Sequence, residues 1–384
     1  MDFSRVELSS EDQAFLDEVR SFLSEHVTDD VRRRDRETGD NFDEDVHLAA
    51  GAAGYLAGEL KSAADGGFSP VRRRIWELER CRTRMPWWHT GTTVMIARTI
   101  EPFASPAVRD EVLPGVLSGH IRLCLGFTEP DGGSDVATCK TRAVRDGDGW
   151  IINGSKMFTS NAHHSQYVFL LTNSDPDGPK HKNLTMFLVP LDTPGIEIQG
   201  IRTVDGDRTN ITYYSDVRVD DKYRLGEVSG GWTVLRAALN VEHGIVERDT
   251  AGLQKLAAMA EHGDLMAEAV DRVAAVVAEN GLLADQSVAH RLGRGIAGME
   301  AALSTPGMFG RVAIAQTMRD VSPDLMDILG AASSLPGDDV AAEYIFRLSL
   351  PTGVYGGTLE VFRNMIAEHA LGLRRPDYSA PKPG

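Results

Sequence analysis

Cysteine is scarce in this chain of 384 residues, which holds three. Cys81, Cys124 and Cys139 form no Cys-x-x-Cys pair, so the sequence suggests neither a disulfide framework nor a thiolate metal site. An odd number of cysteines without a pairing motif is typical of a reducing compartment. We therefore expect a cytoplasmic protein.

Long apolar runs are also absent. No segment approaches the roughly 18 apolar residues that span a bilayer, and the first residues, MDFSRVELSSEDQ, lack the apolar core of a signal peptide. Positive charge is in deficit, because 40 lysines and arginines face 56 aspartates and glutamates for a net charge of -16. Such a surface repels a phosphate backbone, so we expect neither nucleic acid nor a membrane as partner.

What the chain does hold is 42% hydrophobic residues in patterns that change along its length. Residues 1–115 read as helices, because Phe15 and Val19 begin a run of apolar residues at helical spacing. Residues 116–228 contain short β-branched and aromatic runs between turn residues, as antiparallel strands do. Helical periodicity returns over 229–384. This order predicts an α+β fold with three domains and these boundaries.

Two segments follow predicted strands and combine hydroxyls with turn residues. The first, FTEPDGGSD at 127–135, offers backbone N–H groups that could cradle an anion, although such a turn is more often only a turn. Its acids, Glu129 and Asp135, are best explained as groups that hold the loop. The second, KMFTSN at 156–161, places an aromatic residue before two hydroxyls, and a plain strand end explains it too.

A third segment, YGGT at 355–358, precedes a predicted helix. Thr358 can cap that helix, and the two glycines allow a ligand to approach the backbone closely. Free N–H groups at the helix start favour a negatively charged ligand. A plain junction between loop and helix explains the segment equally well.

Together and in this order, the three segments resemble the flavin-site segments of the acyl-CoA dehydrogenase family. There they read like TEPGAGSD, KMWITN and YEGTSEIQRNIIAERVLGLPR, the last against YGGTLEVFRNMIAEHALGLRRP here. The resemblance covers the whole chain. It implies an N-terminal α-helical domain, a middle antiparallel β domain and a C-terminal four-helix bundle domain. It also implies FAD as cofactor, an acyl-CoA thioester as substrate and electron-transferring flavoprotein as acceptor.

The resemblance also implies a role for each matching position. Thr128 and Ser160 would hydrogen-bond the flavin ring, and Phe158 would stack on it. Ser134 would contact the FAD pyrophosphate or the pantetheine of the substrate. The backbone at Gly356 would reach the thioester carbonyl. The candidate cofactor-binding residues are Phe127, Thr128, Gly133, Ser134, Phe158, Ser160, Thr358 and Glu360.

The family's catalytic base needs a separate argument, because many members carry a Glu at the position of Gly356, which cannot act as a base. Some members place it instead on the first helix of the C-terminal domain. There Glu242 falls on the apolar stripe of Leu235 and Leu239, and LNVEHG resembles the family's L-x-x-E-R. In an apolar cleft its pKa would rise, which suits a base. A salt-bridged structural acid is the alternative.

Other titratable groups have simpler explanations. His163 and His164 could be a metal pair, but no third ligand follows at coordinating spacing, so a loop surface is favoured and no metal is expected. Glu360 at the start of a helix is explained by the helix dipole.

The sequence differs from the family at two positions where other members contribute residues to the flavin site of a neighbouring subunit. The Arg-x-x-Phe-Gly motif is missing from the aligned stretch 278–295, and Asp327 stands at the Gln position of a Q-x-x-G-G-x-x-G loop. The resemblance therefore implies a homo- or heterotetramer, with an α2β2 assembly in which a complementary subunit completes the site. The PKHKN loop and the RTNITYY strand resemble members that oxidise bulky, steroid-like thioesters.

Three functions stay open at this point. The chain is an active FAD-dependent acyl-CoA dehydrogenase, which Glu242 supports, or a non-catalytic subunit that completes a partner's site, which Gly356 and the missing Arg motif support. The third alternative is a flavin enzyme of the same fold that uses oxygen.

Overall fold

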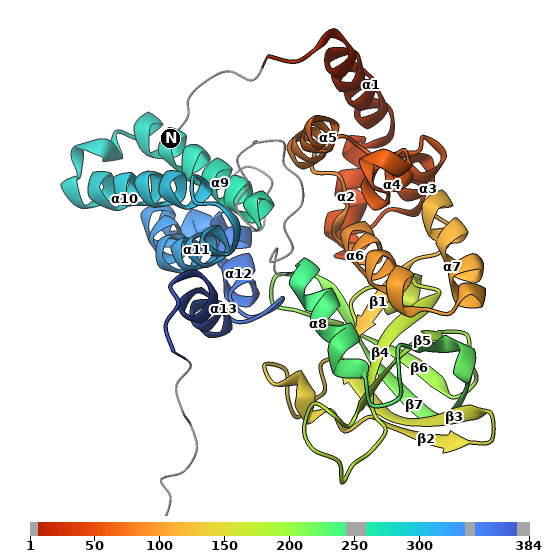
Figure 1. The fold of residues 1–384 in the computed structure, drawn as a ribbon. Helices are drawn as coiled ribbons and strands as arrows, with labels where there is room; N and C mark the ends of the chain where they lie inside the picture. Colours follow the sequence, from red (N-terminus) through yellow and green to blue (C-terminus); the bar gives the residue numbers. More distant parts are fainter. Residues whose placement is uncertain (1–6, 243–258, 335–341, 375–384) are drawn as a thin grey trace, which may run out of the picture. The chain divides into compact units, whose positions relative to one another are not determined.

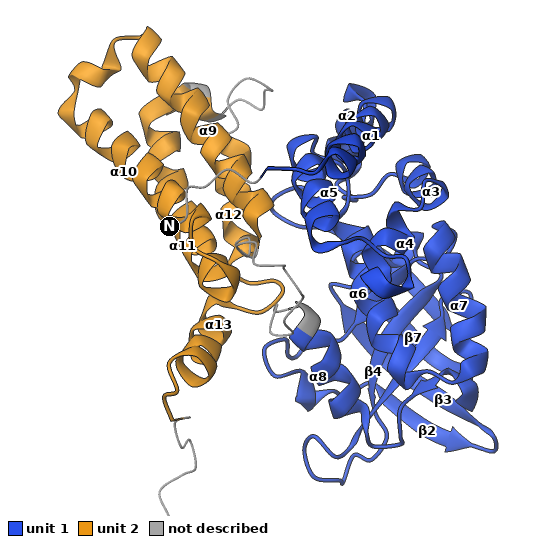
Figure 2. Ribbon diagram, turned by 45° about the horizontal axis from the view of Figure 1, so that its top comes forward, with its two compact units in different colours: residues 1–253 blue, residues 254–384 orange. Residues whose placement is uncertain are grey.

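The computed structural model of this chain describes residues 7–242, 259–334 and 342–374. The chain divides into two compact units, 1–253 and 254–384 (Figure 2). In the described residues, the first unit holds helices followed by a sheet and one further helix, and the second unit holds helices. The predicted order of helices, strands and helices is therefore confirmed.

The first unit begins with helices that are capped by side chains. Ser9 caps the first helix, because its hydroxyl accepts a hydrogen bond from the Asp12 N–H at 3.1 Å. Phe15 and Val19 are buried, as their spacing predicted. The helices before the sheet are α1 (Ser10–His26), α2 (Asp29–Thr38), α3 (Glu44–Ala52), α4 (Tyr55–Leu60), α5 (Pro70–Arg82), α6 (Trp88–Phe103) and α7 (Pro106–Ser118) (Figure 1).

The sheet follows, and its strands pair in the order β6-β7-β3-β2-β4-β5-β8, with β1 beside β4. Strands β2 and β3 form an antiparallel hairpin, and Gly147 in its turn has a φ of 60°. The strands are β1 (Leu123–Gly126), β2 (Arg142–Asp146), β3 (Gly149–Met157), β4 (Tyr167–Asn173), β5 (Leu184–Pro190), β6 (Ile196–Arg202), β7 (Arg208–Asp220) and β8 (Arg224–Leu225).

The sheet is mostly, not wholly, antiparallel. Strand β4 pairs in parallel with β1 from Tyr167 to Leu170 and with the start of β2 at one position. The expectation of a purely antiparallel sheet therefore needs this correction. The physical reason is connectivity, because the chain between β1 and β4 forms the β2–β3 hairpin and returns to the edge of β1 in the same direction.

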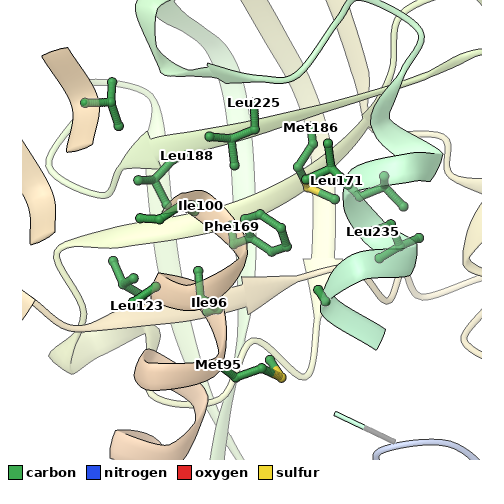
Figure 3. Packing of buried hydrophobic residues seen from close by; sticks show 14 of the residues in the cluster. Met95, Ile96, Ile100, Leu123, Phe169, Leu171, Met186, Leu188, Leu225 and Leu235 are labelled. Atoms are coloured by element: carbon green, nitrogen blue, oxygen red, sulfur yellow. The ribbon is translucent and has the colours of Figure 1, made fainter. Parts of the chain in front are cut away.

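The centre of the sheet is buried on both faces, which explains the continuous apolar runs of β4 and β5. Phe169 and Leu171 of β4 belong to one core cluster, and Val168 and Leu170 between them belong to another. In the first cluster they meet Ile96 and other side chains of α6 and α8 (Gly231–Glu242) (Figure 3). Each such side chain contributes about 1.5–3 kcal/mol when it is fully buried.

The second unit is built from α9 (Ala260–Glu279), α10 (Gln286–Leu303), α11 (Gly307–Leu329), α12 (Ala342–Thr352) and α13 (Leu359–Met365). The first four of these pack around one core that includes Met266, Val270, Met299 and Ile314. The C-terminal helices thus match the implied fold.

The change from helix to strand falls between α7 and β1, and the reverse change falls between β8 and α8. Helix α8 packs on α6 and β5 within the first unit. The domain boundaries at 115 and 228 stay predictions. Among the described helices, none combines the length and the apolar character that crossing a bilayer requires.

Candidate functional site

The ends of β1 and β3 bring the first two segments of the sequence analysis together. The Met157 N–H donates to the carbonyl oxygen of Thr128 at 2.9 Å, so the chain after β1 runs beside the end of β3. The Lys156 ammonium donates to the carbonyl oxygen of Phe127 at 3.2 Å. The Phe127 ring packs against the core, where its centroid lies 5.6 Å from that of Phe169 in an edge-on arrangement. Phe127 therefore anchors the segment.

A buried ion pair holds the loop after β1. Lys156 has no exposed surface, and its ammonium lies 2.8 Å from Oε1 of Glu129. The Glu129 carboxylate also accepts from the N–H groups of Lys140 at 2.7 Å and Thr141 at 2.8 Å. The sequence-based interpretation of Glu129 as a loop-holding acid is confirmed.

The pKa of Glu129 reflects these contacts. Burial alone would raise this pKa, but the charge of Lys156 and the hydrogen bonds that it and Thr141 donate lower it to about 2. The carboxylate therefore stays ionised at neutral pH. Sequence reasoning missed Lys156, although its place in β3, on the same face as buried Trp150 and Ile152, was a usable signal.

Phe158 lies directly after β3 with its ring uncovered. Its side chain is 54% exposed, and its φ of 60° lies in the left-handed region, which bulky residues avoid. A strained backbone that presents an apolar ring to the outside is an arrangement found at ligand sites. Thr159 is fully buried, and its N–H donates to the Asn210 carbonyl oxygen at 2.9 Å. This hydrogen bond fixes the turn to β7.

Two residues with hydroxyl groups lie close to Phe158 along the chain or across the strand ends: Ser160 follows it by two positions, and Thr128 pairs with Met157 before it. Ser160 is exposed, and its hydroxyl exchanges a hydrogen bond with Thr209 at 2.9 Å. Thr128 is half-buried. An apolar ring next to hydroxyls fits a large planar group with polar edges, which is the shape of a flavin ring. The first two segments therefore fit FAD.

Gly133, the candidate cofactor-binding glycine of the first segment, is exposed. Gly133 does not adopt a left-handed conformation, and a Cβ added there would meet the Thr128 methyl group at 3.5 Å, an ordinary contact. Nothing within the first unit requires glycine at this position. Ser134 beside it is exposed.

The third segment forms a tight turn in the second unit. Gly356 and Gly357 both lie in the left-handed region, with φ of 60° and 97°. The Thr358 hydroxyl accepts from the Val361 N–H at 3.2 Å, so the predicted cap of α13 is confirmed. Because left-handed backbone costs about 1–2 kcal/mol for a residue with a Cβ, the turn itself favours glycine at 356.

Two residues that sequence reasoning missed support this turn. Arg311, which is 2% exposed, donates from Nη2 to the Tyr355 carbonyl oxygen at 2.9 Å. The Tyr355 hydroxyl hydrogen-bonds Nε2 of His262 at 2.7 Å. No local pattern singles out either residue, because both reach the turn from other helices.

Glu360 follows the cap in the first turn of α13 and is exposed. Its pKa is lowered, first by a hydrogen bond from its own N–H group and further by the Thr358 hydroxyl and by Arg363. This agrees with the interpretation that the helix start stabilises a negative charge.

The structure describes the surroundings of Asp327 but not the side chain of Glu242, the candidate base. Glu242 is the last residue of α8, and its side chain lies outside the described residues. Asp327, at the Gln position of the family loop, pairs with Arg291 at 3.0 Å, and Asp324 pairs with the same guanidinium at 2.8 Å. These pairs join α10 to α11 within the second unit.

Comparisons with known proteins agree with this geometry. The sequence profile "Acyl-CoA dehydrogenase, N-terminal domain" matches residues 9–120, and "Acyl-CoA dehydrogenase, middle domain" matches residues 124–221. The acyl-CoA dehydrogenase IpdE1 of Mycobacterium tuberculosis is 32% identical over 297 residues, which cover 73% of this chain and 74% of IpdE1. The chain belongs to the acyl-CoA dehydrogenase family.

Two further members show how far this likeness extends. The acyl-CoA dehydrogenase FadE29 of the same organism is 32% identical over 247 residues, which cover 62% of each chain, less than two thirds of FadE29. The solved structure of the Tcur3481-Tcur3483 steroid ACAD has a TM-score of 0.80 and 30% identity, and the match covers 97% of this chain and 100% of that one. The acyl-CoA dehydrogenase fold of this chain is therefore established.

Proposed function

We propose that this chain is the catalytic subunit of an FAD-dependent acyl-CoA dehydrogenase that forms a double bond between the α and β carbons of a thioester. The observation that carries the proposal is the exposed Phe158 ring, held in left-handed backbone beside the Thr128 strand end. Membership of the acyl-CoA dehydrogenase family supports the same reaction.

Each unit contains residues that we propose as cofactor contacts, and each set is described by itself. Phe158 offers an apolar face, Thr128 and Ser160 offer hydroxyls, and Ser134 is exposed for a phosphate or pantetheine contact. When bound, FAD supplies the acceptor for the β-hydrogen as hydride. In the second unit, Thr358 and Glu360 mark the start of α13, whose N–H groups favour a negatively charged ligand.

We propose Glu242 as the base that removes the α-proton. It follows Ala238 by four residues and Val234 by eight, and both are buried on the inner face of α8, so helical periodicity predicts the same face for Glu242. Gly356 cannot act as the base, but we propose that its N–H group donates to the thioester oxygen as negative charge develops there. A weakly acidic α-proton requires both the base and this donor.

We further propose a complementary subunit, a bulky acyl group and electron-transferring flavoprotein as acceptor. One support is the name of the steroid ACAD, Tcur3481-Tcur3483, which names two gene products. Another is the ion pair between Arg291 and Asp327, because Asp327 stands at the position of the family's Gln. The Arg291–Asp327 ion pair also favours a second candidate function, a non-catalytic subunit that completes a partner's site.

The test is anaerobic addition of a steroid-type acyl-CoA to the purified chain, alone and co-expressed with the product of a neighbouring gene. Bleaching of the flavin absorbance that depends on this chain's Glu242 supports the catalytic subunit. Bleaching that survives Glu242→Gln in the assembled complex places the base on the other chain and supports the second candidate.

A further inference from the structure

A cluster of Asp40, His163 and His164 follows the Phe158 turn in the structure and has no role in the proposed function. The short helix Ala162–His164 presents His163 and His164 to one carboxylate, Asp40, from the loop after α2. Nε2 of His163 lies 3.1 Å from one oxygen of Asp40, and Nε2 of His164 lies 3.2 Å from the other. The sequence suggested a loop surface for these histidines, but the side chain of His163 is only 14% exposed and that of Asp40 only 10%.

The second ring nitrogen of His163 continues the chain of contacts. Nδ1 of His163 lies 3.2 Å from the amide nitrogen of Asn210, which also donates to the Thr159 carbonyl oxygen at 3.0 Å. Asn210 and Thr159 are fully buried. The Thr159 N–H in turn donates to the Asn210 carbonyl oxygen. A continuous series of hydrogen bonds therefore links Asp40 to the residue between Phe158 and Ser160.

The hydrogen-bond partners of His163 indicate which of its two ring nitrogens carries the proton. Because the Asn210 amide donates to Nδ1, the ring carries its proton on Nε2 and donates it to Asp40. The donor atoms of Asp40, His163 and His164 also lie within 4.8 Å of one another, a spacing that a metal could use. However, the nitrogen that a metal would need is the protonated one, so hydrogen bonding explains the cluster better than a cation does.

The Asp40 loop is itself fixed to the sheet. The Asn41 amide donates to Asp207 at 2.8 Å, and the Arg208 N–H donates to the Gly39 carbonyl oxygen at 2.6 Å. Thr209, the next residue of β7, shares a hydrogen bond with the Ser160 hydroxyl. The Asp40 end of the series is thus bound to β7, the strand whose Thr209 contacts Ser160 of the Phe158 turn.

We propose that Asp40, His163 and Asn210 are positioning residues for the flavin-facing turn at 158–160. This inference rests on the proposed function, because it assigns to that turn the contact with FAD. His164 supplies a second contact to Asp40 but none to Asn210 in the described structure, so it is a matched control for His163.

The experiment uses the full chain with any partner that it needs and compares His163→Phe with His164→Phe. Both variants keep a ring of similar size. We expect His163→Phe and Asp40→Asn to weaken FAD affinity about tenfold, the scale of one lost hydrogen bond to a charged group, and to shift the flavin absorbance maximum. We expect His164→Phe to change affinity less than threefold and to leave the spectrum unchanged. His163→Asn keeps an acceptor near the Nδ1 position and should recover part of the affinity.

Equal FAD affinity and equal spectra in the His163→Phe and wild-type proteins would overturn the proposal. So would stoichiometric Co²⁺ binding that is lost in Asp40→Asn, because the cluster would then be a metal site. If the wild-type assembly binds no FAD, the proposed function fails instead, and this outcome is distinct from an unchanged His163→Phe variant. Circular dichroism of each variant separates a lost contact from a lost fold.

Discussion

The two units hold their family segments by different physical means. In the first unit, the loop after β1 depends on a buried ion pair between Lys156 and Glu129. In the second unit, the turn before α13 depends on the left-handed backbone of Gly356 and Gly357 and on Arg311, which donates to a carbonyl oxygen. Two segments that resemble the same family in sequence therefore respond to different perturbations. Charge removal and acid should affect the first, whereas an added Cβ should affect the second.

The largest expected effect is that of Lys156→Met, which leaves Glu129 buried and unpaired. We expect a loss of about 3–5 kcal/mol in the free energy of unfolding, measured by urea titration with tryptophan fluorescence. Lys140→Met is the control, since its ion pair with Asp131 is exposed on both sides and should cost about 1 kcal/mol or less. Similar losses in the two variants would contradict the buried pair.

Acid should weaken the first unit through the same carboxylate. The folded pKa of Glu129 is about 2, below its ordinary value of 4.5, so the stabilisation is present above pH 4.5 and is lost as the pH falls through 2. The shift corresponds to about 3 kcal/mol. Urea titrations between pH 5 and pH 2 measure it. The Lys156→Met variant should lack this loss of stability, and a wild-type curve that is flat over the interval would refute the prediction.

Glu242→Gln tests which unit supplies the base, because the usual position in the second unit is Gly356. The change keeps the shape of the side chain and removes its basicity. We expect the rate of flavin reduction by acyl-CoA to fall about a hundredfold, the scale of a lost positioned base, while acyl-CoA binding survives. Stopped-flow absorbance measures the rate. Glu227→Gln, at an exposed site before α8, should leave it unchanged.

The smallest effect is expected at the turn of the second unit. Gly356→Ala forces a Cβ into left-handed backbone and should cost about 1–2 kcal/mol in the free energy of unfolding. Gly133→Ala is the matched glycine of the first unit, and its Cβ would make an ordinary contact, so its stability should stay within about 0.5 kcal/mol of wild type. A reversal of this order would show that the turn conformation is not what requires glycine.

Local patterns in the sequence were sufficient to predict the element order and several ends of elements. Hydrophobic period and turn chemistry predicted the helical and strand regions and the Thr358 cap, because each depends on residues within a few positions of one another. The motif resemblance added the family, since it compares short segments in order. The parallel pairing of β1 with β4 was missed, because strand direction depends on the path of the chain between them.

What the sequence by itself determined is therefore the order of helical and strand regions, the Thr358 cap, and the family to which the chain belongs. Only the tertiary structure decided that Glu129 meets Lys156, that Arg311 supports Tyr355, and that Asp40 faces His163 across 123 positions of sequence. The physical reason is that these pairs lie on different elements. Their proximity follows from how those elements pack, and no periodicity within one element encodes it.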